Sequence, residues 1–172
     1  MSKGRTDAKI RYAEAMLRDL QERPGAEGDD FQRAREEAFV FHLHGAIDAF
    51  LHEINDHHGC GLAANQVTLF GLEHWFVGSG GVSPALQEIR RMLVDDQTAL
   101  GRVRVWRHEA THRGGTPRTF YKGGAEDGQR RLKDPTTGDP SGKSMLEEFA
   151  EAASEMRTTI RRLRAMLAAT RP

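Results

Sequence analysis

The fold is decided by one stretch, DDFQRAREEAFVFHLHGAIDAFLHEIN, residues 29–55. Its apolar residues recur every three or four positions and form a wide stripe, at Phe39, Leu43, Ala46, Ile47, Phe50 and Ile54. This spacing is typical of an α-helix, and a stripe this wide predicts a central helix that touches several neighbours. Asp29 or Asp30 can cap the start of the helix, and Gly59 and Gly61 end it.

The segments next to this central helix show the same periodicity. Residues 7–22 predict an amphipathic helix that ends at Pro24-Gly25. Residues 62–77 predict a shorter third helix that Gly71 interrupts. The N-terminal half of the chain is therefore expected to be helical throughout, with short connections.

Two start signals define the helices of the C-terminal half. Ser83-Pro84 combines a capping hydroxyl with a proline at the first helical position, so a helix is predicted to begin there and to run to Gly114-Gly115. Gly101 is expected to kink or split that helix. Ser144-Met-Leu-Glu147 is a capping box, which predicts a last helix reaching to about Thr170.

Residues 114–142 separate these two helices and contain seven glycines and three prolines. A loop of this length is unusual in a compact domain, so we expect a flexible, functional segment, with a short hairpin possible within residues 118–122. The prediction is an all-α fold, a four- to five-helix bundle with this long Gly/Pro-rich loop before the last helix. Residues 1–172 are expected to form a single domain, with the long helices near 30–55 and 143–170 packed antiparallel or nearly so.

Charge is balanced over the chain but not along it. The 172 residues carry 25 basic and 25 acidic side chains, whereas residues 102–133 hold nine Lys or Arg against three Asp or Glu, a net charge of +6. Such a segment points either to an anionic partner or to an ordinary solvated face. Cys60 is the single cysteine, which suits a reducing cytoplasm. We expect neither a signal peptide nor a membrane span, because the sequence contains no apolar run of the required length.

The basic segment contains the clearest chemical motif, in the stretch RVRVWRHEATHR, residues 102–113. Arg107 and His112 form an R-x4-H pair, with the polar His108 directly after the arginine. An arginine can hold a phosphate, and an imidazole can move a proton near neutral pH, as a metal-independent ribonuclease would require. A loose R-x4–6-H pattern occurs three times in the chain, and the basic helix end with its Gly-rich loop is what distinguishes this pair.

The segment Arg107-His-Glu-Ala-Thr-His112-Arg113 resembles the signature of the HEPN superfamily, which is Arg, a polar residue, three residues and then His. That superfamily comprises small α-helical bundles, many of them metal-independent ribonucleases of toxin–antitoxin, abortive-infection and CRISPR systems, while other members lack catalysis. The resemblance implies Arg107 as the phosphate ligand, His112 as general acid or base and His108 as an assisting group. HEPN toxins silenced by a nucleotidyltransferase often carry a tyrosine where this chain has Gly114.

The resemblance also implies partners. Two such motifs usually face each other across a dimer cleft in the superfamily, so a homodimer that cleaves single-stranded RNA is expected, without a cofactor. The RNA-binding residues that we expect around the motif are Arg104, Arg113, Arg118, Tyr121 and Lys122, with Phe120 as a second stacking surface. An inhibitory or effector protein is a further possible partner.

A second constellation lies on the central helix, at His44, Asp48 and His52. Their i, i+4, i+8 spacing puts all three on one stripe of the helix. They could bind a transition metal, form a polar ladder in which Asp48 orients both imidazoles, or line the active cleft behind the catalytic residues. We expect them to contact one another or water and to hold no metal.

The sequence thus leaves three functions open. The first is a HEPN-like, metal-independent endoribonuclease, acting as a bacterial toxin or antiphage-defence component. The second is a non-catalytic helical protein-binding module, in which Arg107 caps a helix end and pairs with Glu109 or another acid. The third is a metal-binding helical bundle.

Overall fold

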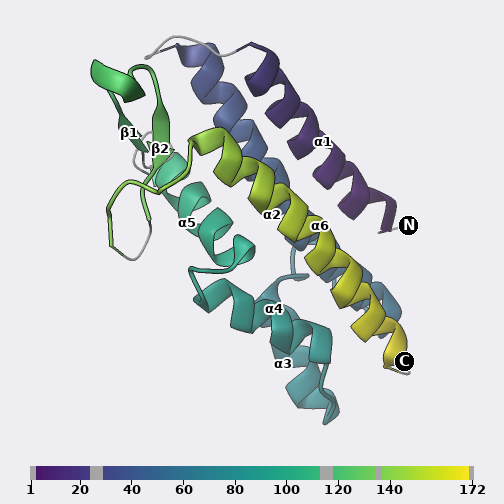
Figure 1. Cartoon of the computed structure of the whole chain (residues 1–172). Helices are drawn as coiled ribbons and strands as arrows, with labels where there is room; N and C mark the ends of the chain where they lie inside the picture. The colour runs from purple at the N-terminus through teal and green to yellow at the C-terminus, as the bar shows by residue number, and fades with distance from the viewer. Residues whose placement is uncertain (1–2, 24–28, 113–117, 135–136, 171–172) are drawn as a thin grey trace.

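The protein is mostly helical, as a computed structural model shows for residues 3–23, 29–112, 118–134 and 137–170 (Figure 1). The helices are α1 (Lys3–Glu22), α2 (Asp30–His57), α3 (Leu69–Ser79), α4 (Pro84–Val94), α5 (Ala99–His112) and α6 (Met145–Ala169). The two strands are β1 (Arg118–Phe120) and β2 (Arg130–Leu132), with a short 3₁₀ turn, Gly124–Glu126, between them. The predicted helical class is confirmed, but the described residues form six α-helices rather than four or five.

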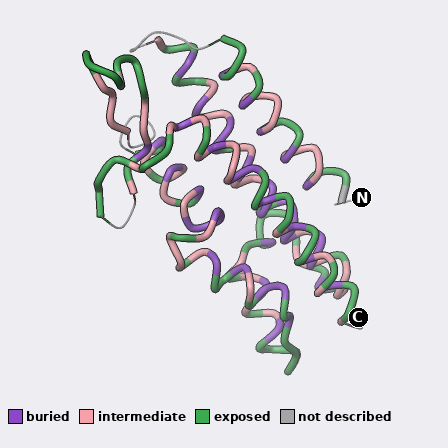
Figure 2. Tube along the Cα trace, viewed as in Figure 1, coloured by how far each residue is buried: buried purple, intermediate pink, exposed green. Residues whose placement is uncertain are grey.

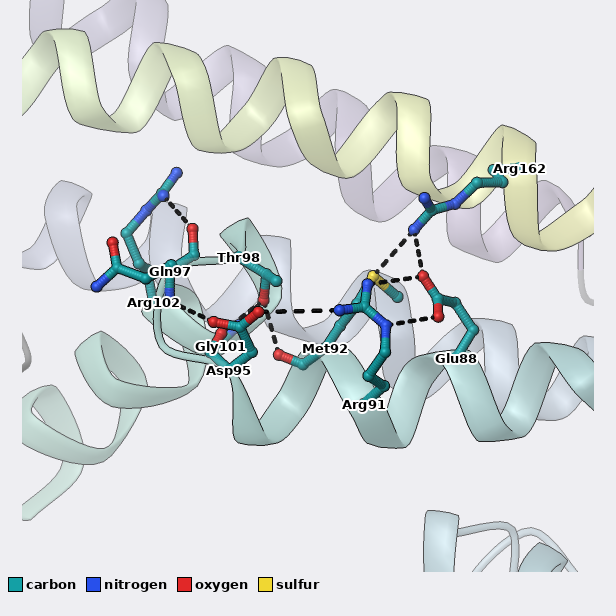
Figure 3. Close-up of polar contacts among 9 residues, drawn as sticks. All are labelled: Glu88, Arg91, Met92, Asp95, Gln97, Thr98, Gly101, Arg102 and Arg162. Atoms are coloured by element: carbon teal, nitrogen blue, oxygen red, sulfur yellow. Dashed lines mark hydrogen bonds and ion pairs between the residues drawn. The ribbon is translucent and has the colours of Figure 1, made fainter.

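The extra helix arises because the chain between Ser83 and His112 turns at residues 95–98, and Gly101 lies in the first turn of α5 (Figure 3). The Thr98 hydroxyl donates to the Met92 carbonyl (2.7 Å) and accepts from the Gly101 amide (3.0 Å). A Cβ on Gly101 would overlap the Asp95 carbonyl and lie 2.7 Å from its carbon. Only glycine therefore lets α5 begin so close to the end of α4.

The long helices α1, α2 and α6 form the body of the molecule (Figure 1). Phe39 stacks on Phe149 near the starts of α2 and α6, and His57 hydrogen-bonds the Thr170 carbonyl beyond their ends. These contacts show that α2 and α6 run parallel, so the antiparallel prediction was wrong. The reason is that residues 58–144 carry the chain back to the starting end of α2 before α6 begins. The antiparallel neighbour of both helices is α1.

The core runs along the buried faces of all six helices (Figure 2), and one part of it lies where α2, α5 and α6 meet. Trp106 of α5 and Phe39 of α2 both pack on Phe149 of α6, with ring centroids 5.5 and 4.3 Å away. All three rings are at most 1% exposed, and burying each is worth about 1.5–3 kcal/mol. Among the described residues, no helix combines the length and the apolar character needed to cross a membrane.

The segment before α6 contains a hairpin, which is longer than predicted. Strand β1 pairs with β2 in antiparallel register, Arg118 opposite Leu132, rather than turning back within residues 118–122. Leu132 is 1% exposed and anchors the hairpin in the core, while Arg118 forms an ion pair with the buried Glu36 of α2. The hairpin is therefore held against the bundle at its first residue and at its last.

Candidate functional site

Helix α5 presents the R-x4-H motif because its opposite face is buried. Val103, Trp106 and Ala110 follow one another at helical spacing and are 0%, 1% and 8% exposed. This leaves Arg107 half-buried at the edge of the interface and puts His108 and His112 on the exposed side. The motif therefore occupies the last two turns of the helix, next to residues 113–117, which are outside the described residues.

Arg107 and His112 lie on different sides of α5. Five residues of an α-helix correspond to a rotation of about 140° around its axis, because each residue turns the helix by roughly 100°. The Arg107 guanidinium lies against α2, with its Cζ 5.7 Å from the centre of the Phe41 ring. His112 instead pairs with His108, one turn earlier. Within a single chain, the two motif residues therefore do not converge on one point.

His108 and His112 form a pair of exposed imidazoles. Their ring centroids are 4.8 Å apart and their planes are tilted by 51°. The i, i+4 spacing on a regular helix places both rings on one stripe, so this proximity follows directly from the sequence. Two imidazoles at this distance can donate and accept protons on the same bound group.

Behind Arg107, helix α2 supplies a second polar pair. His44 Nδ1 lies 3.3 Å from Asp48 Oδ2, and the His44 side chain is 12% exposed against 59% for Asp48. Partial desolvation acts to raise the pKa of Asp48, but the hydrogen bond from His44 and the positive charges of His44, Arg107 and Lys9 lower it below its ordinary value. The positive charge of Arg107 on α5 thus acts on this pair of α2.

Of the contacts predicted among His44, Asp48 and His52 on α2, only the one between His44 and Asp48 is formed. His44 and Asp48 interact, whereas in the described part of the chain His52 makes no hydrogen bond to Asp48. Over the same residues, no three His, Cys, Asp or Glu side chains are grouped so that they could hold a metal ion. The arrangement at His44 and Asp48 is therefore a polar pair and not a ladder of three residues.

The predicted RNA-binding residues are distributed between α5 and the hairpin. Arg104 forms an ion pair with Asp96 (2.9 Å), and Arg118 is held by Glu36. Arg113 lies outside the described residues. Because Glu36 is 1% exposed, Arg118 serves first to neutralise a buried carboxylate and to fix the hairpin.

The hairpin carries two aromatic rings, each accompanied by cations. Arg131 lies over the Tyr121 ring at 5.2 Å. Lys122 and Arg130 lie 5.9 and 5.8 Å from the centre of the Phe120 ring. Cation–π contacts of this kind keep aromatic faces and positive charge together at a surface. The hairpin could therefore offer both to a nucleic acid.

The sequence analysis did not identify two residues that contribute to this region, Phe41 and Lys9. Phe41 precedes His44 by three positions and shares its face of α2, so the helical spacing could have identified it. Lys9 acts on Asp48 from α1, and its Cδ and Cε lie 3.5 Å from where a Cβ on Gly45 would be. No sequence signal links Lys9 to Asp48, because their proximity depends on how α1 packs on α2.

Comparisons of the chain with protein-family models, with curated proteins and with solved structures find no match to any of them.

Proposed function

We propose that this chain is a metal-independent endoribonuclease whose catalytic residues are Arg107, His108 and His112. The observation that supports this function is the pair of exposed imidazoles at the end of α5, 4.8 Å apart and beginning directly after Arg107. Cleavage of RNA through its own 2′-hydroxyl needs a base to take the hydroxyl proton and an acid to protonate the leaving oxygen. Two imidazoles can fill these roles without a metal, and the guanidinium can stabilise the charge on the phosphate.

The geometry of α5 adds a condition, namely that the active form is a homodimer. Arg107 and His112 of one chain face about 140° apart, so one phosphate is not reached by both from the same helix. In a two-fold dimer with α5 at the interface, Arg107 of one chain can meet His112 of the other. This agrees with the dimer cleft that the HEPN resemblance implies. Tyr121 and Lys122 of the hairpin would bind flanking nucleotides, with Arg104 and Arg113.

The first experiment measures cleavage of a mixed single-stranded RNA by purified protein, with and without EDTA. Wild type should cut equally in both conditions. His112→Ala should lower the rate by about 10²–10⁴-fold, since it removes the proton-transfer group, and Arg107→Ala by about 10²–10³-fold. The matched controls are His74→Ala and Arg33→Ala, because both residues are exposed and lie on α3 and α2. Full activity of His112→Ala would disprove the assignment.

A second experiment tests whether the site is shared between two chains. Arg107→Ala and His112→Ala proteins should each be nearly inactive alone, whereas mixed dimers would contain one intact site. A one-to-one mixture should therefore recover about one quarter of the wild-type rate, since half the dimers are mixed and each has one of two sites. Absence of recovery, with wild type active, would contradict the shared site.

A second candidate is a non-catalytic helical protein-binding module. The contact of Arg107 with Phe41 and its effect on Asp48 favour it, because they engage the arginine within its own fold. In that case wild type cuts no RNA at any concentration, and Arg107→Ala lowers stability instead. Measuring the unfolding free energy of Arg107→Ala together with the cleavage rate therefore separates the two functions.

A further inference from the structure

A groove between α1 and α6 lies on the side of the bundle away from α5. Helix α6 contacts both α1 and α5, and in Figure 1 these two helices flank it on opposite sides. The groove has a volume of about 480 Å³. Its floor is apolar, formed by Ile10 (5% exposed) and Ile160 (1% exposed). None of the predicted site residues lines it.

The groove is strongly basic. Five arginines line it against two acids, and Glu53, which binds one of these arginines from behind the lining, brings the net charge of the group to +2. Two of the arginines are engaged by carboxylates. Arg164 binds Glu53 through two hydrogen bonds of 2.8 and 2.9 Å and Asp7 through a third, and Arg157 pairs with Glu14.

The other three arginines supply the excess charge. Arg11 and Arg18 of α1 and Arg161 of α6 are exposed, and none of them forms an ion pair or a hydrogen bond with a carboxylate among the described residues. They face a groove whose acids are already paired. Cations held in this way, without counter-charges of their own, attract anions from solution.

The spacing of the three arginines selects an extended anion. The pairs Asp7–Arg164 and Glu14–Arg157 put α1 and α6 in an antiparallel register that brings Arg161 level with Arg11. Arg18 lies two turns further along α1, which is about 10.5 Å. Because the nucleotides of one stacked strand rise by about 3.4 Å each along the helix axis, this distance corresponds to roughly three nucleotide steps. A single phosphate ion could not reach both ends.

We propose that this groove binds the sugar–phosphate backbone of a single nucleic-acid strand, without reading its sequence. The lining residues include no aromatic ring on which a base could stack and no amide that could read a base edge. Guanidinium groups are well suited to phosphate, which they bind with two parallel hydrogen bonds. The inference rests on the proposed function for RNA as the natural ligand, and it gives that RNA an anchoring surface separate from α5.

The test is fluorescence anisotropy with labelled twelve-nucleotide oligouridylate and oligothymidylate. The DNA strand has no 2′-hydroxyl and cannot be cleaved by the proposed chemistry, so binding is measured whether or not the protein is a nuclease. Wild type should bind both strands with similar Kd. The Arg11→Gln, Arg18→Gln, Arg161→Gln variant should bind at least tenfold more weakly at about 0.1 M salt. Its slope of log K against log salt should be smaller by about 2, since roughly 0.7 is lost per phosphate contact.

The matched control is Arg5→Gln, Arg33→Gln, Arg90→Gln, which removes the same charge from exposed arginines outside the groove. It should keep the wild-type Kd to within about twofold. Thermal unfolding of each variant verifies the fold, and Arg161→Glu alone provides a second, single-site variant that should also weaken binding. The proposal that the groove binds nucleic acid would be overturned if wild type did not bind DNA. It would also be overturned if the groove variant and the control variant lost the same amount of affinity. If wild type bound DNA but cleaved no RNA, only the proposed nuclease activity would be refuted.

Discussion

Gly101 gives the sharpest stability test. A change from glycine to alanine should lower the free energy of unfolding at this position but raise it at Gly45. A Cβ on Gly101 would lie 2.7 Å from the Asp95 carbonyl carbon and 2.9 Å from Asp96 Cα, both of them backbone atoms. A backbone turn cannot rotate out of the way as a side chain can, so the start of α5 must move. That movement also disturbs the hydrogen bond from the Gly101 amide to Thr98.

The expected size follows from these terms. Overpacking costs about 1–3 kcal/mol, and a weakened cap adds about 1 kcal/mol. The better helix propensity of alanine offsets roughly 1 kcal/mol. Gly101→Ala should therefore lower the free energy of unfolding by about 1–3 kcal/mol. In Gly45→Ala, the three atoms nearest to the new Cβ all belong to the flexible Lys9 side chain, the first at an ordinary 3.5 Å, so this variant should gain up to about 1 kcal/mol in unfolding free energy.

Urea unfolding followed by circular dichroism measures both variants. With a slope near 2 kcal/mol per molar urea, Gly101→Ala should shift the midpoint down by about 0.5–1.5 M and Gly45→Ala should shift it up by a few tenths. The reasoning fails if Gly101→Ala is as stable as wild type. It also fails if the two variants shift in the same direction.

The remaining predictions concern buried charge and pH. Arg164→Ala should lower the free energy of unfolding by about 3 kcal/mol, because it leaves the carboxylate of Glu53, which is 2% exposed, without its partner. Arg157→Ala, which removes an exposed pair, should cost about 1 kcal/mol or less, and equal losses in urea unfolding would contradict this account. Burial, and then the charge of Lys9, lower the pKa of His42 below its ordinary value. The folded state therefore binds fewer protons than the unfolded state, so stability is complete above about pH 6.5 and falls as the pH is lowered through that value. His42→Phe should reduce this loss between pH 7 and 5, and an unchanged pH dependence of the unfolding midpoint would refute the assignment.

Local signals in the sequence accounted for most of the helices. The capping box at Ser144 and Glu147 is present at the start of α6, and Ser83 caps α4. These signals work because capping and helical periodicity involve residues within one or two turns of each other. The same local rule explains why His108 and His112 could be placed side by side in advance.

The hairpin and the orientation of the long helices were not determined locally. Strands β1 and β2 have three residues each, too few to show an alternating pattern, and they form because Leu132 enters the core while Arg118 meets Glu36. Similarly, α2 and α6 run parallel because of the path of the chain between them. Neither result can be read from the hydrophobic periodicity of one segment, which is the same for either direction of a helix.

The sequence by itself determined the helical class, the starts of α2, α4 and α6, and the stripe that His108 and His112 share. Tertiary structure alone decided what each arginine does, since all arginines carry the same charge and donors. Arg118 and Arg164 neutralise buried carboxylates, Arg107 lies against Phe41, and Arg11 remains open on a groove. The physical reason is that a buried carboxylate is stabilised by whichever cation the fold places beside it. These partners are 82 or 111 residues apart, so no local pattern in the sequence indicates which residues will pair.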